Sequence, residues 1–252
     1  MDNTVLRLPE MERNDMSIPS LFLESQKTAK EARFIIGYYG FWVQLTYLSV
    51  ISAALGMHFA LGGNIGYALI CVMASGVCYT LYGRVASMNK RNAREKTYGI
   101  QIDSLADIIS FGVLPAVIGY AAGSSYSIQN YGPLGMAVTI IIVSLYLLAA
   151  LIRLAYFNVI ETELQSRNEK RKYYEGLPVT SVALIFPAAY ALCDLLHIPF
   201  FAVYAVLTAL VSVAFVLKIK IPKPRGRSQI AICLMGIPVV IYIFLSGLSG
   251  GK

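Results

Sequence analysis

The chain has 252 residues, of which 57% are hydrophobic and only 14% charged, and its mean hydropathy is +0.62. Soluble domains of this length are about half apolar and about a quarter charged, so the composition excludes a soluble, a disordered and a disulfide-knit extracellular protein. On a soluble domain, a net charge of +7 would suggest nucleic-acid binding. On so apolar a chain the basic residues are first considered as membrane-flanking charges. The sequence therefore predicts a polytopic membrane protein that does not bind nucleic acid.

Seven apolar stretches are long enough, or nearly so, to cross a bilayer, since a transmembrane helix needs about 20 mostly apolar residues. In chain order they are residues 34–55, 66–82, 104–122, 134–157, 179–196, 200–217 and 230–247. Pro187 lies inside the fifth stretch and predicts a kink there. The predicted fold class is all-α, a polytopic bundle of transmembrane helices.

The basic residues separate between alternate loops. Those before the first stretch and after the second, fourth and sixth number five, five, four and five of the 21 Lys and Arg residues. The loops at 56–65, 123–133 and 197–199 contain none. The positive-inside rule then predicts an integral protein of the inner or cytoplasmic membrane, with its N-terminus cytoplasmic and its C-terminus outside. Residues 1–33 are predicted to be cytoplasmic, either as an interfacial helix or as a solvated tail.

The cysteines do not indicate a metal site. All four fall within apolar stretches, show no metal-ligand spacing and are interpreted as small packing residues: Cys71, Cys78, Cys193 and Cys233.

Asp103 and Asp107 are the strongest candidates for chemistry, because ionisable residues at the edge of a membrane span are costly and so tend to be functional. Their i, i+4 spacing places both carboxylates on one helix face, one turn apart, where the third apolar stretch begins. Two carboxylates this close repel each other unless a cation lies between them, so a divalent metal is the simplest explanation. The alternative is that they cap the helix N-terminus and pair with Arg84 or Arg94.

The segment Gly99-x-x-x-Asp103-x-x-x-Asp107 resembles the second half of the signature of the CDP-alcohol phosphotransferases. These membrane enzymes transfer a phosphatidyl or similar group from a cytidine-diphosphate donor to an alcohol. The longer string Asp-Ser-Leu-Ala-Asp-Ile-Ile-Ser-Phe-Gly-Val-Leu-Pro at 103–115 is similar to the phosphatidylserine-synthase branch. Three further stretches, at 153–158, 174–178 and 221–224, also resemble this branch, and they occur in the same order along the chain.

The resemblance covers about residues 46–224 and implies a domain organisation. The family's six-helix transmembrane core would lie within residues 34–228. Residues 229–252 would then be an additional transmembrane helix and tail.

The resemblance also implies a role for each matching position. Asp103 and Asp107 would bind metal, and Asp107 would take the proton from the attacking alcohol. The positions matched to nucleotide binding are Gly83, Ala86 and Gly99, and those matched to substrate binding are Arg153, Asn158, Gly176 and Pro178. The turn at 176–178 is interpreted either as an anion site built from free backbone amides or as a simple helix start with proline in the first turn.

The first half of the family signature, Asp-x-x-Asp-Gly-x-x-Ala-Arg, is altered in this chain. Residues 79–87 read Tyr-Thr-Leu-Tyr-Gly-Arg-Val-Ala-Ser, so Tyr79, Tyr82 and Ser87 replace the two aspartates and the arginine. The spacer before Gly99 is also longer than is usual in the family. The two tyrosines either stack on a cytosine ring or lipid headgroup, or fill the space of the lost metal ligands.

In the family, four aspartates hold two divalent cations that clamp the donor's diphosphate. With two carboxylates missing, the expected cofactor is one Mg²⁺ or Mn²⁺ rather than two, or none. The basic residues at 90–96 either take over the role of the second cation or form an ordinary positive-inside loop.

The resemblance implies a phospholipid-synthesis transferase that uses CDP-diacylglycerol and L-serine, in contact with membrane lipids and as a homodimer. The alternative is a catalytically impaired paralogue that binds lipid, nucleotide or a partner enzyme. A channel or transporter is disfavoured, because no charged pathway crosses the bilayer and the two halves show no internal repeat.

Overall fold

The computed structural model describes residues 36–88, 92–167, 173–222 and 226–249. The chain divides into two compact units, residues 1–38 and 39–252. All the elements discussed below belong to the second unit. The predicted interfacial helix within residues 1–33 lies outside the described part of the chain.

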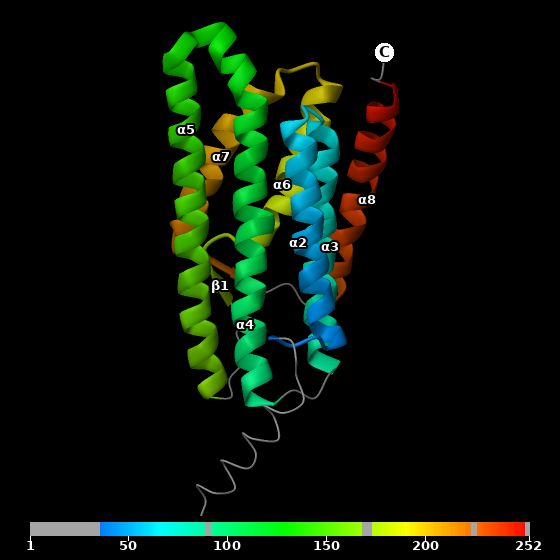
Figure 1. Ribbon diagram of the computed structural model, residues 1–252, viewed down its shortest axis with the longest axis vertical. Helices are drawn as coiled ribbons and strands as arrows, with labels where there is room; N and C mark the ends of the chain where they lie inside the picture. The colour runs from blue at the N-terminus through cyan, green and yellow to red at the C-terminus, as the bar shows by residue number, and fades with distance from the viewer. Residues whose placement is uncertain (1–35, 89–91, 168–172, 223–225, 250–252) are drawn as a thin grey trace, which may run out of the picture. The chain divides into compact units, whose positions relative to one another are not determined.

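The described residues of the second unit form a bundle of helices, which confirms the all-α prediction (Figure 1). The helices are α2 (Phe41–Leu61), α3 (Ile65–Met88), α4 (Ala93–Asp107), α5 (Leu114–Ser166), α6 (Val182–Leu195), α7 (Phe200–Val216) and α8 (Gly226–Ser249). A π-helix, η1 (Ile108–Val113), joins α4 to α5, and a 3₁₀ turn, η2 (Val179–Ser181), precedes α6. Two short strands, β1 (Tyr173–Glu175) and β2 (Lys220–Pro222), pair in antiparallel orientation.

Hydropathy located the helices well. By length and composition, four helical runs can cross a membrane: Trp42–Leu61, Ile65–Gly83, Arg94–Ser124 and Gln129–Leu164. Three shorter apolar helices follow at Val179–Leu195, Phe200–Val216 and Leu234–Gly247. Each predicted apolar stretch is therefore helical over most of its described length, although helix begins only at Phe41 in the first.

The predicted loop at 123–133 is wrong, because helix continues through most of it. Helix α5 runs from Leu114 to Ser166 with a sharp kink at Gly132, where φ is 62° and ψ is −152°. Glycine adopts this positive φ without the steric cost that a Cβ would add, and Pro133 then starts the second part of α5. In Figure 1 the first part of α5 continues the line of α4, and its second part returns beside α7.

The start of α4 is a second correction. The helix begins at Ala93, about three turns before the apolar stretch. The Asn92 side chain accepts a hydrogen bond from the Glu95 amide at 2.8 Å, and the Glu95 carboxylate accepts one from the Asn92 amide at 3.0 Å. This capping box fixes the N-terminal end of the helix. Asp103 and Asp107 therefore lie well inside a helical run, and the interpretation of them as N-terminal caps is wrong.

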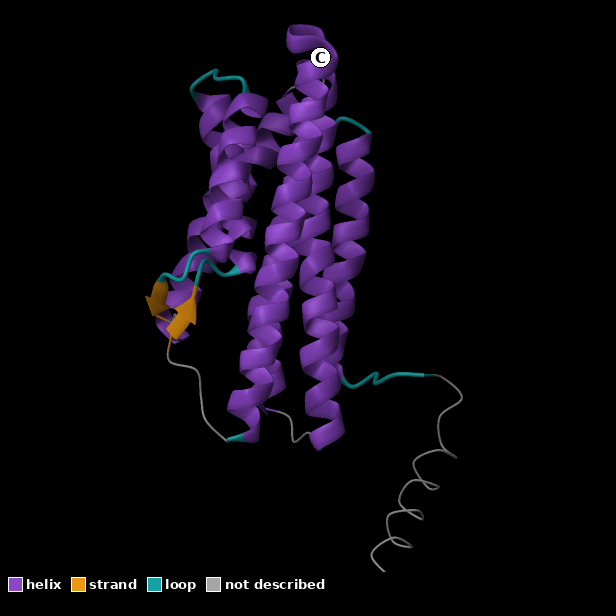
Figure 2. Ribbon diagram, turned by 90° about the vertical axis from the view of Figure 1, so that its left-hand side faces the viewer, coloured by secondary structure: helices purple, strands orange, loops and turns teal. Residues whose placement is uncertain are grey.

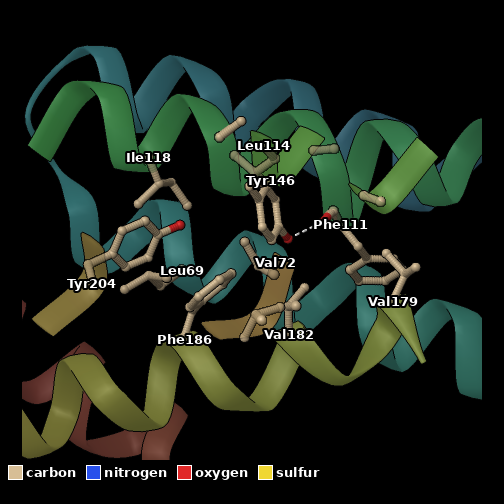
Figure 3. Packing of buried hydrophobic residues seen from close by; sticks show 14 of the residues in the cluster. Leu69, Val72, Phe111, Leu114, Ile118, Tyr146, Val179, Val182, Phe186 and Tyr204 are labelled. Atoms are coloured by element: carbon tan, nitrogen blue, oxygen red, sulfur yellow. Dashed lines mark hydrogen bonds between the residues drawn. The ribbon is translucent and has the colours of Figure 1, made fainter. Parts of the chain in front are cut away.

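An aromatic layer fills the centre of the bundle (Figure 3). The rings of Phe186 and Tyr204 lie 4.7 Å apart, and those of Tyr146 and Phe186 lie 6.0 Å apart. The Tyr146 hydroxyl donates to the Phe111 carbonyl at 2.5 Å, drawn as the dashed line in Figure 3. Phe111 lies in the π-helix, whose altered hydrogen-bond ladder is thus supported from a neighbouring helix.

Several glycines allow close helix packing inside this bundle. A Cβ on Gly119 would meet the Tyr204 ring at 2.9 Å, and one on Gly123 would collide with the Phe201 ring, so both glycines admit α7 aromatics against α5. A Cβ on Gly66 would lie 3.1 Å from Ile243 of α8. These small residues therefore bring helices of one chain together.

The helices alternate in direction, so that the loops lie at two ends (Figures 1 and 2). The α2–α3 turn, the kink in α5 and the α6–α7 turn lie at one end. The end of α3, the start of α4, the end of α5 and the strand pair lie toward the other. The described basic residues of the predicted loops belong to this second end: Arg94 and Lys96 in the first turn of α4, Arg167 after α5, Lys218 before β2 and Lys220 in β2.

Candidate active site

One cavity of about 900 Å³ brings together residues from both halves of the family signature. Asp107 and Arg153 line it from α4 and α5, and Tyr79 lines it from α3. Thr180 and Ser181 of η2 add two hydroxyl groups. Most of the remaining lining is apolar and comes from α2, α3, α6 and α8. The cavity therefore joins a small polar region to an extended apolar one.

The second half of the signature lies along one face of α4, as the spacing predicts. Gly99 is buried, Asp103 is half-buried one turn later, and Asp107 is 9% exposed after one turn more. Asp107 reaches the cavity. A buried carboxylate with a second carboxylate beside it is costly unless a cation is near. This arrangement provides a strong attraction for positive charge at the cavity wall.

A π-helix follows Asp107 directly, and sequence reasoning missed it. In η1 the Leu114 amide donates to the Ile109 carbonyl, five residues back. The buried Ser110 hydroxyl donates to the Ser49 carbonyl at 3.3 Å and so ties this segment to α2. Single π turns occur frequently at functional sites. Neither hydropathy nor residue spacing distinguishes such a turn from an α-helix.

Arg153 is a buried cation in the same cavity. Its side chain is 4% exposed, although it lies on a helix that is apolar overall. Its Nε donates to the Leu177 carbonyl at 3.3 Å, and its guanidinium carbon lies 5.6 Å from the centre of the Phe157 ring. A guanidinium held in this way is well suited to bind phosphate oxygens.

The turn at 176–178 supports Arg153 instead of offering free amides. The Gly176 amide donates to Ile219 at 2.8 Å and the Leu177 amide donates to Ala214 at 3.0 Å. The expectation that these amides receive an anion is therefore wrong, because the end of α7 and the segment after it already occupy them. Gly176 has a φ of 80°, and Pro178 lines the cavity.

Asn158 lies beside the site without lining the cavity. Its side-chain oxygen accepts a hydrogen bond from the Ser104 hydroxyl at 2.5 Å. Ser104 follows Asp103 directly, so this bond holds α5 against the acidic segment of α4. In the structure Asn158 thus contacts the motif itself.

The altered half of the signature on α3 is only partly in the cavity. Tyr79 lines it, half-buried, and its ring lies edge-on to Phe111 with centres 6.4 Å apart. Tyr82 is buried but does not line the cavity, and Gly83 is exposed with open space around it. The side chains of the two remaining matched positions, Ala86 and Ser87, lie outside the described part of the chain.

The donor set decides which metal site these residues can form. Among the described residues, no group of three or more His, Cys, Asp or Glu side chains could hold a metal ion. A cage for two cations built from protein carboxylates therefore does not fit the described part of this chain. A single Mg²⁺ is commonly bound by one or two carboxylates together with substrate phosphates and water. Asp103 and Asp107 fit that arrangement.

The fold and the site define a helical membrane protein with an ionic site at one end of a largely apolar cavity. No family model matches the chain. It is similar to the CDP-diacylglycerol–serine O-phosphatidyltransferase of Saccharomyces cerevisiae, 40% identical over 119 residues, which are 46% of this chain and 38% of that protein. The enzyme of the same name from Helicobacter pylori is 36% identical over 115 residues, 45% of this chain and 41% of its own length.

An archaetidylserine synthase from Methanothermobacter thermautotrophicus is 28% identical over 146 residues, 58% of this chain and 55% of that protein. The chain thus spans about half or less of the length of these curated relatives. Their names confirm the resemblance to the CDP-alcohol phosphotransferases of the phosphatidylserine-synthase type. They offer no support for a catalytically impaired paralogue.

Proposed function

We propose that the protein transfers a phosphatidyl group from CDP-diacylglycerol to L-serine. The serine hydroxyl oxygen would form a bond to the lipid-side phosphorus, the bond from that phosphorus to the bridging diphosphate oxygen would break, and CMP would leave. The observation that carries the proposal is the single cavity that joins Asp107 and Arg153 to a long apolar region. A lipid with a charged nucleotide headgroup needs both parts.

Asp103 and Asp107 would together hold one divalent cation, Mg²⁺ or Mn²⁺. A bound cation neutralises charge on the diphosphate oxygens during displacement. Asp107, which lines the cavity, would accept the proton of the serine hydroxyl. Arg153 would bind a phosphate oxygen through its guanidinium. Nucleotide contacts at Gly83, Ala86 and Gly99 remain predictions from the family resemblance.

Seven membrane spans with a cytoplasmic N-terminus complete the proposal. The basic residues of the described loops belong to one end of the bundle, which supports a cytoplasmic location for that end. The donor's headgroup would then enter from the cytoplasm. The domain boundaries at 33–34 and 228–229 and the homodimer likewise stay predictions.

The test is CMP release by the purified protein in liposomes that contain CDP-diacylglycerol. We expect release that requires both L-serine and Mg²⁺ or Mn²⁺, and a loss of about 10²- to 10⁴-fold in D107N, the range typical for removal of a general base. Asp194, at the opposite end of the bundle, accepts a hydrogen bond from Tyr242 at 2.8 Å. D194N is the matched control and should retain the rate, because the asparagine side-chain oxygen can still accept the hydrogen bond from Tyr242. CMP release equal in wild type and D107N would contradict the proposal.

A further inference from the structure

Helix α8 forms a wall of the cavity, although it lies outside the six-helix core that the family resemblance implies. Gly236, Ile237 and Val240 of α8 line the same cavity as Asp107 and Arg153. In Figure 1, α8 is the red helix at the edge of the bundle, and it packs against α3 and α6. The additional helix therefore borders the space that the donor would occupy.

Antiparallel contacts hold α8 along α3. A Cβ on either of two glycines would approach a partner on the other helix at 3.1 Å, in the pairs Gly236 with Met73 and Gly66 with Ile243. The Tyr242 hydroxyl of α8 also donates to Asp194 near the end of α6, at 2.8 Å. These contacts fix the wall in place beside the cavity.

The rim of the cavity on this side is apolar and about half exposed. Five lining side chains from α2, α3 and α8 are between 44% and 53% exposed: Leu48, Val77, Leu81, Ile237 and Ile241. On a membrane-spanning bundle such a surface meets lipid acyl chains. The apolar part of the cavity therefore opens sideways toward lipid, whereas Asp107 and Arg153 lie at its polar end.

We infer that α8 completes an acyl-chain site in which one chain of the lipid donor lies between α3, α6 and α8. This inference rests on the proposed function, because the headgroup is placed at Asp107 and Arg153. The occupant is an acyl chain of the donor, because one continuous cavity contains both the charged groups that would bind its headgroup and the apolar lobe. Each methylene buried in the lobe favours binding.

Gly236 sets the width of this lobe. A Cβ at this position would lie 3.1 Å from the methyl carbon of Met73, which is the end of a flexible side chain and can move aside. Met73 lies six residues before Tyr79 on α3, about 9 Å along the helix axis. A larger side chain at position 236 would therefore narrow the lobe at a point distant from the headgroup.

The first test compares donors of different chain length in G236L. We expect kcat/KM for dioleoyl CDP-diacylglycerol to fall about 10-fold or more, since small changes of apolar volume discriminate by such factors. The value for the dihexanoyl donor should change less than about twofold, because its chains end before the narrowed part. G247L is the matched control: a Cβ there lies 3.4–3.9 Å from the Tyr67 ring, in ordinary contact and outside the cavity lining.

The second test needs no turnover. Wild-type protein in liposomes is photolabelled with CDP-diacylglycerol that carries a diazirine in the middle of one acyl chain, and labelled peptides are mapped. We expect label on α8 and α3 around Ile237 and Met73, removed by excess unlabelled CDP-diacylglycerol but not by phosphatidylcholine, and reduced in G236L. The apolar groove between α5 and α7, about 530 Å³ and lined by Leu145 and Val213, reports bulk lipid.

The outcomes separate this inference from the proposed function. Label at α8 that resists competition, or label spread equally over the α5–α7 groove, means bulk lipid only and overturns the inference, even if CMP is released. Competed label at α8 without any CMP release supports the acyl-chain site and contradicts the transferase. Equal losses for both donors in G236L and G247L would also overturn the inference, because they would indicate general damage to the bundle.

Discussion

The two helices that carry the family signature present different chemistry to the same cavity. On α4, Asp103 and Asp107 lie one turn apart on the same face, and Asp107 lines the cavity. Within the described residues, no third ligand joins them in a group that could hold a metal ion. On α3, Tyr79 lines the cavity edge-on to Phe111, and Tyr82 is buried in packing. The α4 side of the site is therefore ionic, whereas the α3 side is aromatic and packs with the core.

This difference teaches where the charge for binding a nucleotide donor must come from. Aspartates on α3 would add negative charge to attract a second cation, whereas tyrosines are neutral at pH 7. Among the described residues that line the cavity, the fixed positive charge is Arg153 on α5, held by the Leu177 carbonyl. Among the described side chains, the ionic site therefore depends on α4, α5 and the turn after β1.

After the loss expected in D107N, the largest effect should come from removing the Arg153 guanidinium. In R153L we expect kcat/KM for CDP-diacylglycerol to fall about 10- to 100-fold, since hydrogen bonds to charged groups contribute about 1.5–3 kcal/mol. Steady-state CMP release against donor concentration measures it, and the loss should appear chiefly in KM.

R153K should recover only part of the loss, because an ammonium lacks the planar fork of a guanidinium. Arg167 lies at the end of α5 in an exposed ion pair with Glu163 at 2.7 Å, and R167L is the matched control. Such exposed pairs contribute at most about 1 kcal/mol, so R167L should retain the rate. Equal losses in R153L and R167L would show that Arg153 has no special role in the cavity.

A smaller effect should follow from making the two walls alike. Y79D places a second carboxylate on the cavity wall, in addition to Asp107, and hard divalent cations favour anionic oxygen ligands. We expect the Kd for Mn²⁺, measured by calorimetry in detergent, to fall about 10-fold, as one added charge contact of about 1.4 kcal/mol would produce. Y79N, neutral and similar in size to the aspartate, should leave the Kd unchanged. If Y79D also leaves it unchanged, position 79 is too far from the aspartates to share a cation.

The last effect is on stability and concerns the turn that supports Arg153. G176A forces an alanine into a φ of 80° and brings its Cβ within 2.8 Å of the Phe215 carbonyl oxygen. Strain of this kind costs about 1–3 kcal/mol, and thermal unfolding in detergent should show the loss. G83A is the control, since Gly83 is helical with open space around it. That change should stabilise by up to about 1 kcal/mol. A stable G176A would mean that the turn relaxes freely.

Much of the fold was predictable because membrane helices are apolar along their whole length. Composition and hydropathy were enough to locate α6, α7 and α8 within about four residues of their observed bounds, and α2 and α3 within about seven. The polar first half of α4 was missed for the same reason, since hydropathy is blind to a polar helix. Asn92 followed by Glu95 was a readable sign of its start. The kink in α5 could also have been predicted, because a glycine followed by a proline, as at Gly132 and Pro133, breaks a helix.

The sequence by itself determined the membrane class, the acidic pair of α4 and its family resemblance, because residue type and i, i+4 spacing are local properties. Only the tertiary structure decided that Arg153 shares a cavity with Asp107, that the amides at 176 and 177 are occupied, and that α8 walls the apolar lobe. These facts depend on which helices meet. Contacts between distant segments are set by the packing of whole helix faces, which no short stretch of sequence encodes.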